Sequence, residues 1–199
     1  MSRTYKVIVA LVIIVVLGYA GWRYYQARRA VKAGIISENI VHSGNDWSAD
    51  FTATIPAPEQ EVFNAVRDVE KARSDQIQNV KVISQTDNTK TVELQMKGFG
   101  DQTVTLQMVF QYDPAAHRIS YHTIDNPAFN MHAEYKFNDQ GSATLINYHQ
   151  TTTMTQQLPV PDTVVKDVIR GVFVSQLEGL KRTLNIASTD ESEDSNDEP

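Results

Sequence analysis

The segment "FTATIPAPEQEVFNAVRDVE", residues 51–70, passes from a strand to a helix within a few residues. Phe51, Ala53 and Ile55 alternate with threonine, and this period of two predicts a half-buried strand that begins near residue 47. Pro56 and Pro58 end the strand, and Pro58 suits the first position of a helix, where its missing N–H is not needed. Apolar residues then recur at helical spacing: Val62, Phe63, Val66 and Val69. We therefore expect a sharp strand-to-helix corner, with a second short helix over "DVEKARS".

Six further segments after the corner have the alternating pattern of strands. They lie at residues 80–82, 92–96, 104–110, 119–123, 131–137 and 143–153. The connections between them are short, which indicates an antiparallel meander of hairpins rather than parallel strands with crossovers.

The segment "PDTVVKDVIRGVFVSQLEGLKRTLN", residues 161–185, predicts a long amphipathic helix. Its expected apolar face consists of Val165, Ile169, Val172, Phe173, Leu177, Leu180 and Leu184. Pro161 and Asp162 suit the beginning of this helix, and Lys181 and Arg182 suit its end, where a cation interacts favourably with the helix dipole.

The order of strand, two short helices, six strands and a long helix resembles the START-like, or SRPBCC, superfamily. The resemblance covers residues 47–186 and rests on "IPAPEQEVFNAVRDVE" at the corner and "LPVPDTVVKDVIRGVFVSQLEGLKRTL" at the end. It implies an α+β helix-grip fold, in which a curved seven-stranded antiparallel sheet surrounds the C-terminal helix. The first strand then lies beside the last, and the two short helices after strand 1 support one end of the grip.

A curved sheet and a single helix leave space between them, so the fold is expected to enclose a cavity. The resemblance implies that residues of its wall contact a hydrophobic ligand. The expected ligand-binding residues are Phe51, Leu94, Met96, Leu106, Met108, Phe110, Tyr121, Met131, Tyr135, Ile169, Val172, Phe173 and Leu177. The alternative is that these side chains pack as an ordinary core.

The ends of the hairpins predict where such a cavity opens. Alternate loops of a meander lie at opposite ends of the sheet, and the loops at one end carry exposed apolar residues. The residues expected at the cavity mouth are Phe99, Phe129 and Leu158. If the first strand runs antiparallel to the last, the preceding segment enters at this end, so we expect the mouth to face a membrane.

The N-terminal segment, residues 1–34, predicts a single-pass transmembrane anchor with a basic juxtamembrane stretch. Between Lys6 and Arg23 lie 16 uncharged residues, "VIVALVIIVVLGYAGW". A helix of this length spans about 24 Å, and aromatic flanks with snorkelling cations can bridge the remainder of a bilayer core of about 30 Å. The alternative is a cleaved signal peptide, with Gly18 and Ala20 at its cleavage site. The side of the membrane that carries the soluble domain is not determined, because basic residues flank both ends of the span.

Composition delimits the rest of the chain. Residues 35–46 show no sustained period and are expected to form a tether, and residues 187–199, with six acids and no base, a disordered acidic tail. The intervening residues, 35–186, hold 12 basic and 18 acidic side chains, which does not fit a nucleic-acid-binding surface. Cysteine is absent, so thiolate nucleophiles and disulfides are excluded.

Candidate catalytic residues are few, and we expect neither a cofactor nor a metal. His149 is the one histidine that could share an inward face with Leu145 of its strand, and there it would perform acid–base chemistry with Tyr121 or Tyr135. The opposite phase, with Ile146 and Tyr148 inward, is equally compatible with the pattern.

Three functions follow from these observations. The first is a membrane-tethered domain that binds a lipid or other hydrophobic small molecule without catalysis. The second is an enzyme of the cyclase or dehydratase type that acts on a hydrophobic substrate, and the third is a protein-interaction module.

Overall fold

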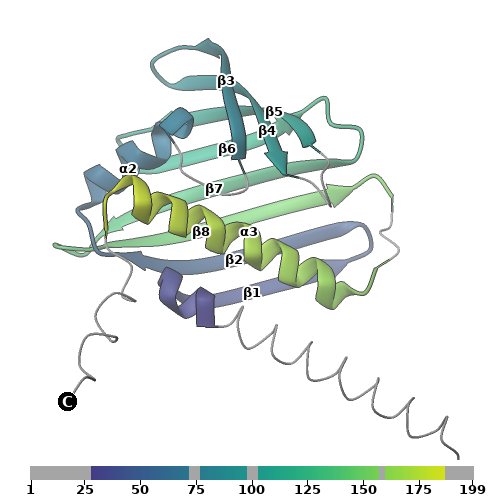
Figure 1. The fold of residues 1–199 in the computed structure, drawn as a ribbon, viewed down its shortest axis with the longest axis horizontal. Coiled ribbons are helices and arrows are strands. Elements are labelled where there is room, and N and C mark those ends of the chain that lie inside the picture. The colour runs from purple at the N-terminus through teal and green to yellow at the C-terminus, as the bar shows by residue number, and fades with distance from the viewer. Residues whose placement is uncertain (1–27, 72–76, 98–102, 157–159, 187–199) are drawn as a thin grey trace, which may run out of the picture.

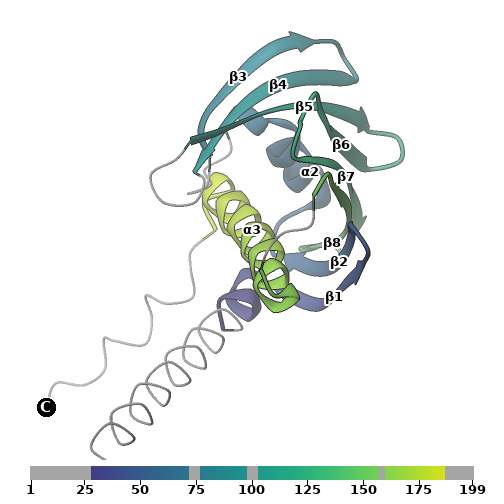
Figure 2. The same ribbon diagram turned by 90° about the vertical axis from the view of Figure 1, so that its right-hand side faces the viewer.

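A computed structural model describes residues 28–71, 77–97, 103–156 and 160–186. The described strands form one eight-stranded antiparallel sheet in the order β1-β2-β8-β7-β6-β5-β4-β3. They are β1 Ile35–Ser43, β2 Asp46–Ile55, β3 Ile77–Gln85, β4 Thr89–Lys97, β5 Thr103–Asp113, β6 Arg118–Ile124, β7 Phe129–Asp139 and β8 Thr144–Met154. The helical elements are α2 Glu59–Arg67, the 3-10 turn η1 Val69–Lys71 and α3 Asp162–Thr183. Figure 1 and Figure 2 show the sheet curving around α3, so the expected α+β helix-grip architecture is confirmed.

The strand-to-helix corner forms where the sequence predicts it. β2 ends at Ile55, and α2 begins at Glu59. Pro58 is the N-cap of α2 and not its first helical residue, so the helix begins one residue later than predicted. The Thr144 hydroxyl donates a buried hydrogen bond of 2.7 Å to the Ala57 carbonyl, which attaches the corner to the first residue of β8. The buried apolar side chains of α2 are Val62 and Phe63, and Phe63 packs edge-on against Phe137 of β7. Within the described residues, the second short helix is the 3-10 turn η1, and the rest of the predicted segment, residues 72–74, lies outside them.

The expected tether at residues 35–46 is wrong, because β1 and the start of β2 occupy this segment. β1 pairs antiparallel with β2 along its length, from Ile35 opposite Ala53 to Ser43 opposite Asp46. Most side chains of β1 are exposed, as suits an edge strand, so it lacks the alternation that marks a half-buried strand. This strand raises the sheet from the expected seven strands to eight. The prediction that the strand before the corner lies beside the last strand is confirmed, since β2 pairs with β8.

The residues before β1 are also packed against the domain. Residues 28–33 are helical, and Ala30 and Ala33 are buried. Arg29 donates two hydrogen bonds to the Glu178 carboxylate of α3, one of them 3.1 Å long. The Lys181 ammonium donates to the Lys32 carbonyl over 2.8 Å. The chain therefore enters beside the C-terminal half of α3, at the opposite end of β2 from the one expected.

Two predicted terminal segments lie outside the described residues. The predicted span, residues 7–22, and the acidic tail, 187–199, both lie there. Within the described ranges, no helix combines the length and the apolar composition that crossing a bilayer requires.

Candidate ligand-binding site

A cavity of about 490 Å³ lies between the sheet and α3. Its volume falls within the range of roughly 300–1,000 Å³ that is usual for small-molecule sites. Most of the predicted wall residues line it: Leu94, Met96, Leu106, Met108, Phe110, Tyr121, Met131, Tyr135, Ile169, Val172 and Leu177. β3 to β8 supply one wall and α3 supplies the other, because alternate strand residues and every third or fourth helix residue face the same space.

Phe51 and Phe173 do not line the cavity, so this part of the prediction is wrong. The two rings stack on each other with centroids 4.4 Å apart, and Phe173 also stacks on Tyr148 at 4.8 Å. Both phenylalanines are almost fully buried, at 2% and 1% exposure. They belong to the packed core that joins α3 to β2 and β8.

Residues at both ends of the cavity were not predicted from the sequence. Trp47 and Met154 line one end, and Ala65, Val66 and Val69 of α2 and η1 line the other. Trp47 is the first apolar residue of the alternating pattern of β2, a signal that identifies it as inward-facing but not as a cavity residue.

Of the predicted mouth residues, Phe129 lines the cavity, whereas Phe99 and Leu158 lie outside the described residues. Val168 of α3 also lines the cavity and is 45% exposed. The cavity wall therefore extends to the surface along the N-terminal half of α3.

A belt of hydrogen-bonded side chains crosses the otherwise apolar cavity. The Tyr121 and Tyr148 hydroxyls lie 2.8 Å apart, and Tyr148 donates to Gln150 Oε1 over 2.6 Å. Gln150 Nε2 then donates to Thr152 Oγ1 over 2.9 Å. The Tyr135 hydroxyl of the neighbouring strand β7 donates to Gln176 Oε1 of α3 over 2.8 Å, which links the sheet to the helix. Of these six residues, which we call the polar belt, all except Tyr148 line the cavity.

The tyrosines of the polar belt are held in the neutral form. Burial raises the pKa of Tyr121, although hydrogen bonds with Tyr148 and Gln176 oppose the shift. Burial also raises the pKa of Tyr135 and of Tyr148 well above its ordinary value. At physiological pH these hydroxyls therefore donate and accept hydrogen bonds but carry no charge.

His149 lies on the face of β8 that points away from the cavity. Ile146 and Tyr148 are the buried residues of this strand, so the alternative phase is the one observed. His149 Nδ1 lies 2.7 Å from Asp50 Oδ1, and its side chain is 48% exposed. The prediction that His149 faces a bound substrate together with Tyr121 or Tyr135 is therefore wrong.

A second histidine connects β1 to α3 near one end of the cavity. His42 Nδ1 lies 2.8 Å from Asp162 Oδ2, and its Nε2 lies 2.7 Å from the Gly44 carbonyl oxygen. The imidazole ring also stacks on Trp47, with ring centroids 4.1 Å apart. The hydrogen bond to Asp162 is the main reason that the pKa of His42 is raised.

The sequence of this domain matches a known protein family. Residues 46–185 match the family model described as "Polyketide cyclase / dehydrase and lipid transport". Comparison with curated protein sequences gives no match.

Solved structures share the fold at low sequence identity. The structure of TTHA0849 from Thermus thermophilus has a TM-score of 0.60 and 17% identity, over 71% of this chain and 99% of that one. The ZhuI aromatase/cyclase from Streptomyces sp. R1128 has a TM-score of 0.57 and 16% identity, over 69% of this chain and 95% of that one. A START superfamily protein from Mycobacterium smegmatis has a TM-score of 0.57 and 16% identity, over 70% of this chain and 99% of that one.

Proposed function

The chain belongs to the polyketide cyclase / dehydrase and lipid transport family, and we propose that its cavity binds a lipid or another hydrophobic small molecule without catalysis. The observation that carries this proposal is the cavity of about 490 Å³ between the sheet and α3. Most of its lining side chains are apolar, and burying a ligand's apolar surface against them contributes roughly 25 cal/mol per Å². Met96, Met108 and Met131 make part of this wall adaptable to ligand shape.

The positions of the titratable groups support binding rather than catalysis. The predicted acid–base residue, His149, lies on the outer face of the sheet and contacts Asp50. Tyr121 and Tyr135 line the cavity, but burial raises the pKa of both, which makes them poor proton donors at neutral pH. The cyclase or dehydratase alternative therefore lacks its candidate acid–base residue, because His149 does not face the cavity.

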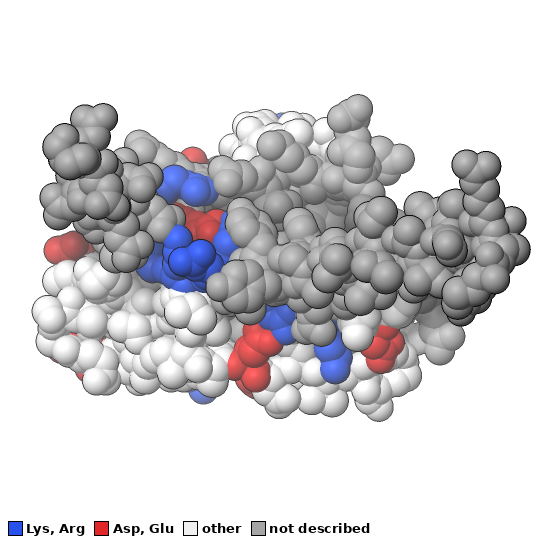
Figure 3. All heavy atoms as spheres, turned by 60° about the horizontal axis from the view of Figure 1, so that its bottom comes forward, with Lys and Arg blue, Asp and Glu red and all other residues white. Residues whose placement is uncertain are grey.

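The proposal includes tethering to a membrane through residues 7–22. A short connection then leads to the packed residues 28–33, so the domain would be held close to the bilayer with its β1 edge nearest. Val31 and Ile36 in this region are 73% and 64% exposed, and apolar side chains suit a membrane interface. Arg28 and Lys32 are also exposed, and Figure 3 shows Lys and Arg side chains grouped on this face. Such cations attract anionic headgroups by about 1 kcal/mol each.

Native mass spectrometry of the full-length protein, purified from membranes in mild detergent, tests the ligand proposal. We expect a bound small hydrophobic molecule on the wild-type protein. Val172→Trp, which extends a lining side chain into the cavity, should lose it. Val164→Trp is the matched control, because Val164 is 39% exposed on the same helix and does not line the cavity. A bound molecule that survives Val172→Trp, or none on any variant, would contradict the proposal.

A further inference from the structure

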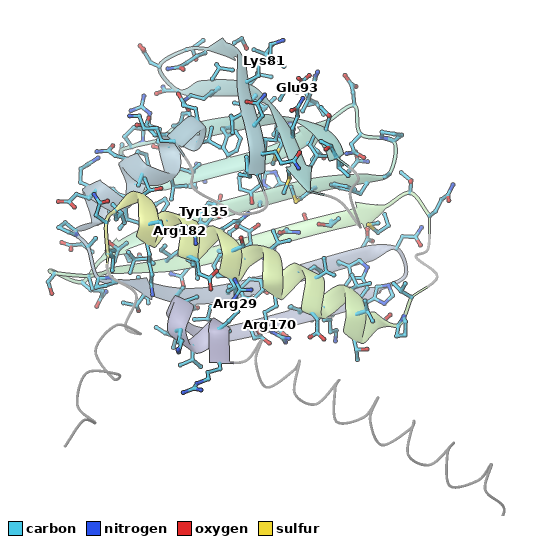
Figure 4. All side chains as sticks on the ribbon, in the orientation of Figure 1. Arg29, Lys81, Glu93, Tyr135, Arg170 and Arg182 are labelled. Atoms are coloured by element: carbon cyan, nitrogen blue, oxygen red, sulfur yellow. The ribbon has the colours of Figure 1, made fainter. Side chains whose placement is uncertain are left out.

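The described part of the cavity wall contains no Lys, Arg, His, Asp or Glu. Three charged side chains of α3, Asp167, Arg170 and Glu178, form ion pairs outside the cavity. Glu178 pairs with Arg29, and Arg170 pairs with Glu38 and Asp167. Figure 4 shows Arg29 and Arg170 on the side of α3 toward β1.

An anionic headgroup would find no counter-ion among these wall residues. Moving an isolated carboxylate from water into such an environment costs several kcal/mol, and the group is expected to take up a proton instead. A cationic headgroup would meet the same penalty, because the described wall holds no carboxylate.

The polar belt provides uncharged hydrogen-bonding groups in a wall that has no charged side chains among its described residues. Its hydroxyl and amide groups come from β6, β7, β8 and α3, so they face the cavity from opposite sides. Gln150 and Gln176 each accept a tyrosine hydroxyl with the side-chain oxygen. Their amide nitrogens hydrogen-bond to Thr152 and to Tyr121, and because an amide NH₂ group has two N–H donors, one N–H of each remains for a ligand. Amide N–H groups donate to neutral oxygen acceptors such as a hydroxyl, a carbonyl or an ether.

We infer that the ligand is an uncharged amphiphile, with a hydrocarbon body and at least one neutral oxygen function that hydrogen-bonds to the polar belt. This inference rests on the proposed function, because it specifies the ligand class of the same cavity. It excludes free fatty acid anions and phospholipid headgroups from the interior, and it favours alcohols, ketones and related neutral molecules over plain hydrocarbons.

Trp47 provides a reporter for the test, because it lines the cavity and the chain has only one other tryptophan, Trp22. The full-length Trp22→Phe protein is reconstituted in nanodiscs of zwitterionic phospholipid. A brominated ligand that enters the cavity then quenches the fluorescence of Trp47. Three probes with the same chain length are compared at pH 8: bromododecanol, bromododecanoate and bromododecane. Each titration is expressed relative to the probe concentration in the bilayer.

We expect bromododecanol to bind at least tenfold more tightly than bromododecanoate, and roughly three- to tenfold more tightly than bromododecane. Gln176→Leu should remove most of the preference for the alcohol over the hydrocarbon. Gln60→Leu, on the exposed face of α2, is the control and should leave that preference unchanged.

The outcomes distinguish the inferred ligand class from the proposed function, which is hydrophobic-ligand binding. Equal or tighter binding of bromododecanoate would overturn the inference and leave hydrophobic-ligand binding intact, as would an alcohol that binds no better than the hydrocarbon. If none of the three probes quenches Trp47, both the inference and the proposed function are wrong.

Discussion

The effect of a substitution on stability and on ligand binding depends on whether the residue faces the cavity or the core. Met108 lines the cavity and is 4% exposed, so its side chain contributes to both stability and ligand contact. Phe173 stacks on Phe51 and on Tyr148 and contributes to the core alone. The helical period in the sequence placed Phe173 and Leu177 on one face, and it carried no information on which of them would meet a core ring.

Two substitutions of Met108 should separate stability from ligand preference. Met108→Asp places a carboxylate in an apolar wall and should lower the free energy of unfolding by several kcal/mol while abolishing ligand quenching of Trp47. Met108→Leu nearly conserves volume, so we expect less than about 1.5 kcal/mol of destabilisation and an altered order of preference among ligands. Chemical denaturation and the quenching titration measure the two effects. If ligand binding is indifferent to both substitutions, Met108 does not form part of the binding wall.

At the scale of elements, the sequence predicted the inner strands and α3 better than the edge of the sheet. The inward-facing strands alternate and α3 has a helical period, because each buries one face. Most side chains of β1 are exposed, and the buried side chains of residues 28–33 are mainly two alanines. Neither segment therefore has a strong hydrophobic period in its sequence. The polar belt is a further case, because its glutamines and threonine become recognisable only when β8 and α3 are brought together.

Gly34 tests whether the segment before β1 is packed as described. Its φ of +97° is disfavoured for other residues, and an added Cβ would lie 2.4 Å from the Thr54 carbonyl oxygen. Gly44, with a φ of +64° and open space around it, is the matched control. Gly44→Ala should cost roughly 1–2 kcal/mol from backbone strain alone, and Gly34→Ala should cost more because the clash adds to the strain. Equal losses in thermal or chemical unfolding would contradict this packing.

The connection of His42 to Asp162 predicts a pH-dependent attachment of β1 to α3. The pKa of His42 is raised above 6.5, mainly by its hydrogen bond to Asp162. A raised folded-state pKa means that the contribution to stability is fully present below pH 6.5 and is lost as the pH rises through the folded-state value.

Unfolding of the wild-type protein should therefore show a loss of stability over this pH range that His42→Phe lacks. Phenylalanine retains an aromatic ring to stack on Trp47 but has no proton to titrate. Asp162→Asn should reduce the same pH dependence. Identical pH profiles for the wild type and both variants would show that the pair does not contribute.

At the scale of the whole molecule, the packed N-terminal residues change the expected orientation on a membrane. The sequence predicted a flexible tether that enters at the apolar mouth. The structure instead pairs Ile35 with Ala53 and joins Arg29 to Glu178, which places the entry at the other end. The error arose because the direction of entry depends on β1, the one strand of the sheet that the pattern did not reveal.

Labels on single cysteines can test this orientation, because the chain has no native cysteine. A polarity-sensitive dye at Val31→Cys should report lipid contact in the nanodisc-reconstituted protein. The same dye at Asn88→Cys, in the turn between β3 and β4 at the opposite edge of the sheet from β1, should report water. A lipid signal at Phe129→Cys with an aqueous signal at Val31→Cys would instead support the orientation expected from the sequence.

The central claim, that the cavity between the sheet and α3 holds a hydrophobic ligand, is tested most directly by locating a ligand covalently. A long-chain alcohol with a photoreactive diazirine on its tail, added to the full-length protein and irradiated, labels the residues that it contacts, and peptide mass spectrometry identifies them. We predict labelling of wall residues such as Met108 of β5, Met131 of β7 and Val172 of α3. Labelling confined to the outer face of the sheet around His149, with these wall residues unmodified, would contradict the claim.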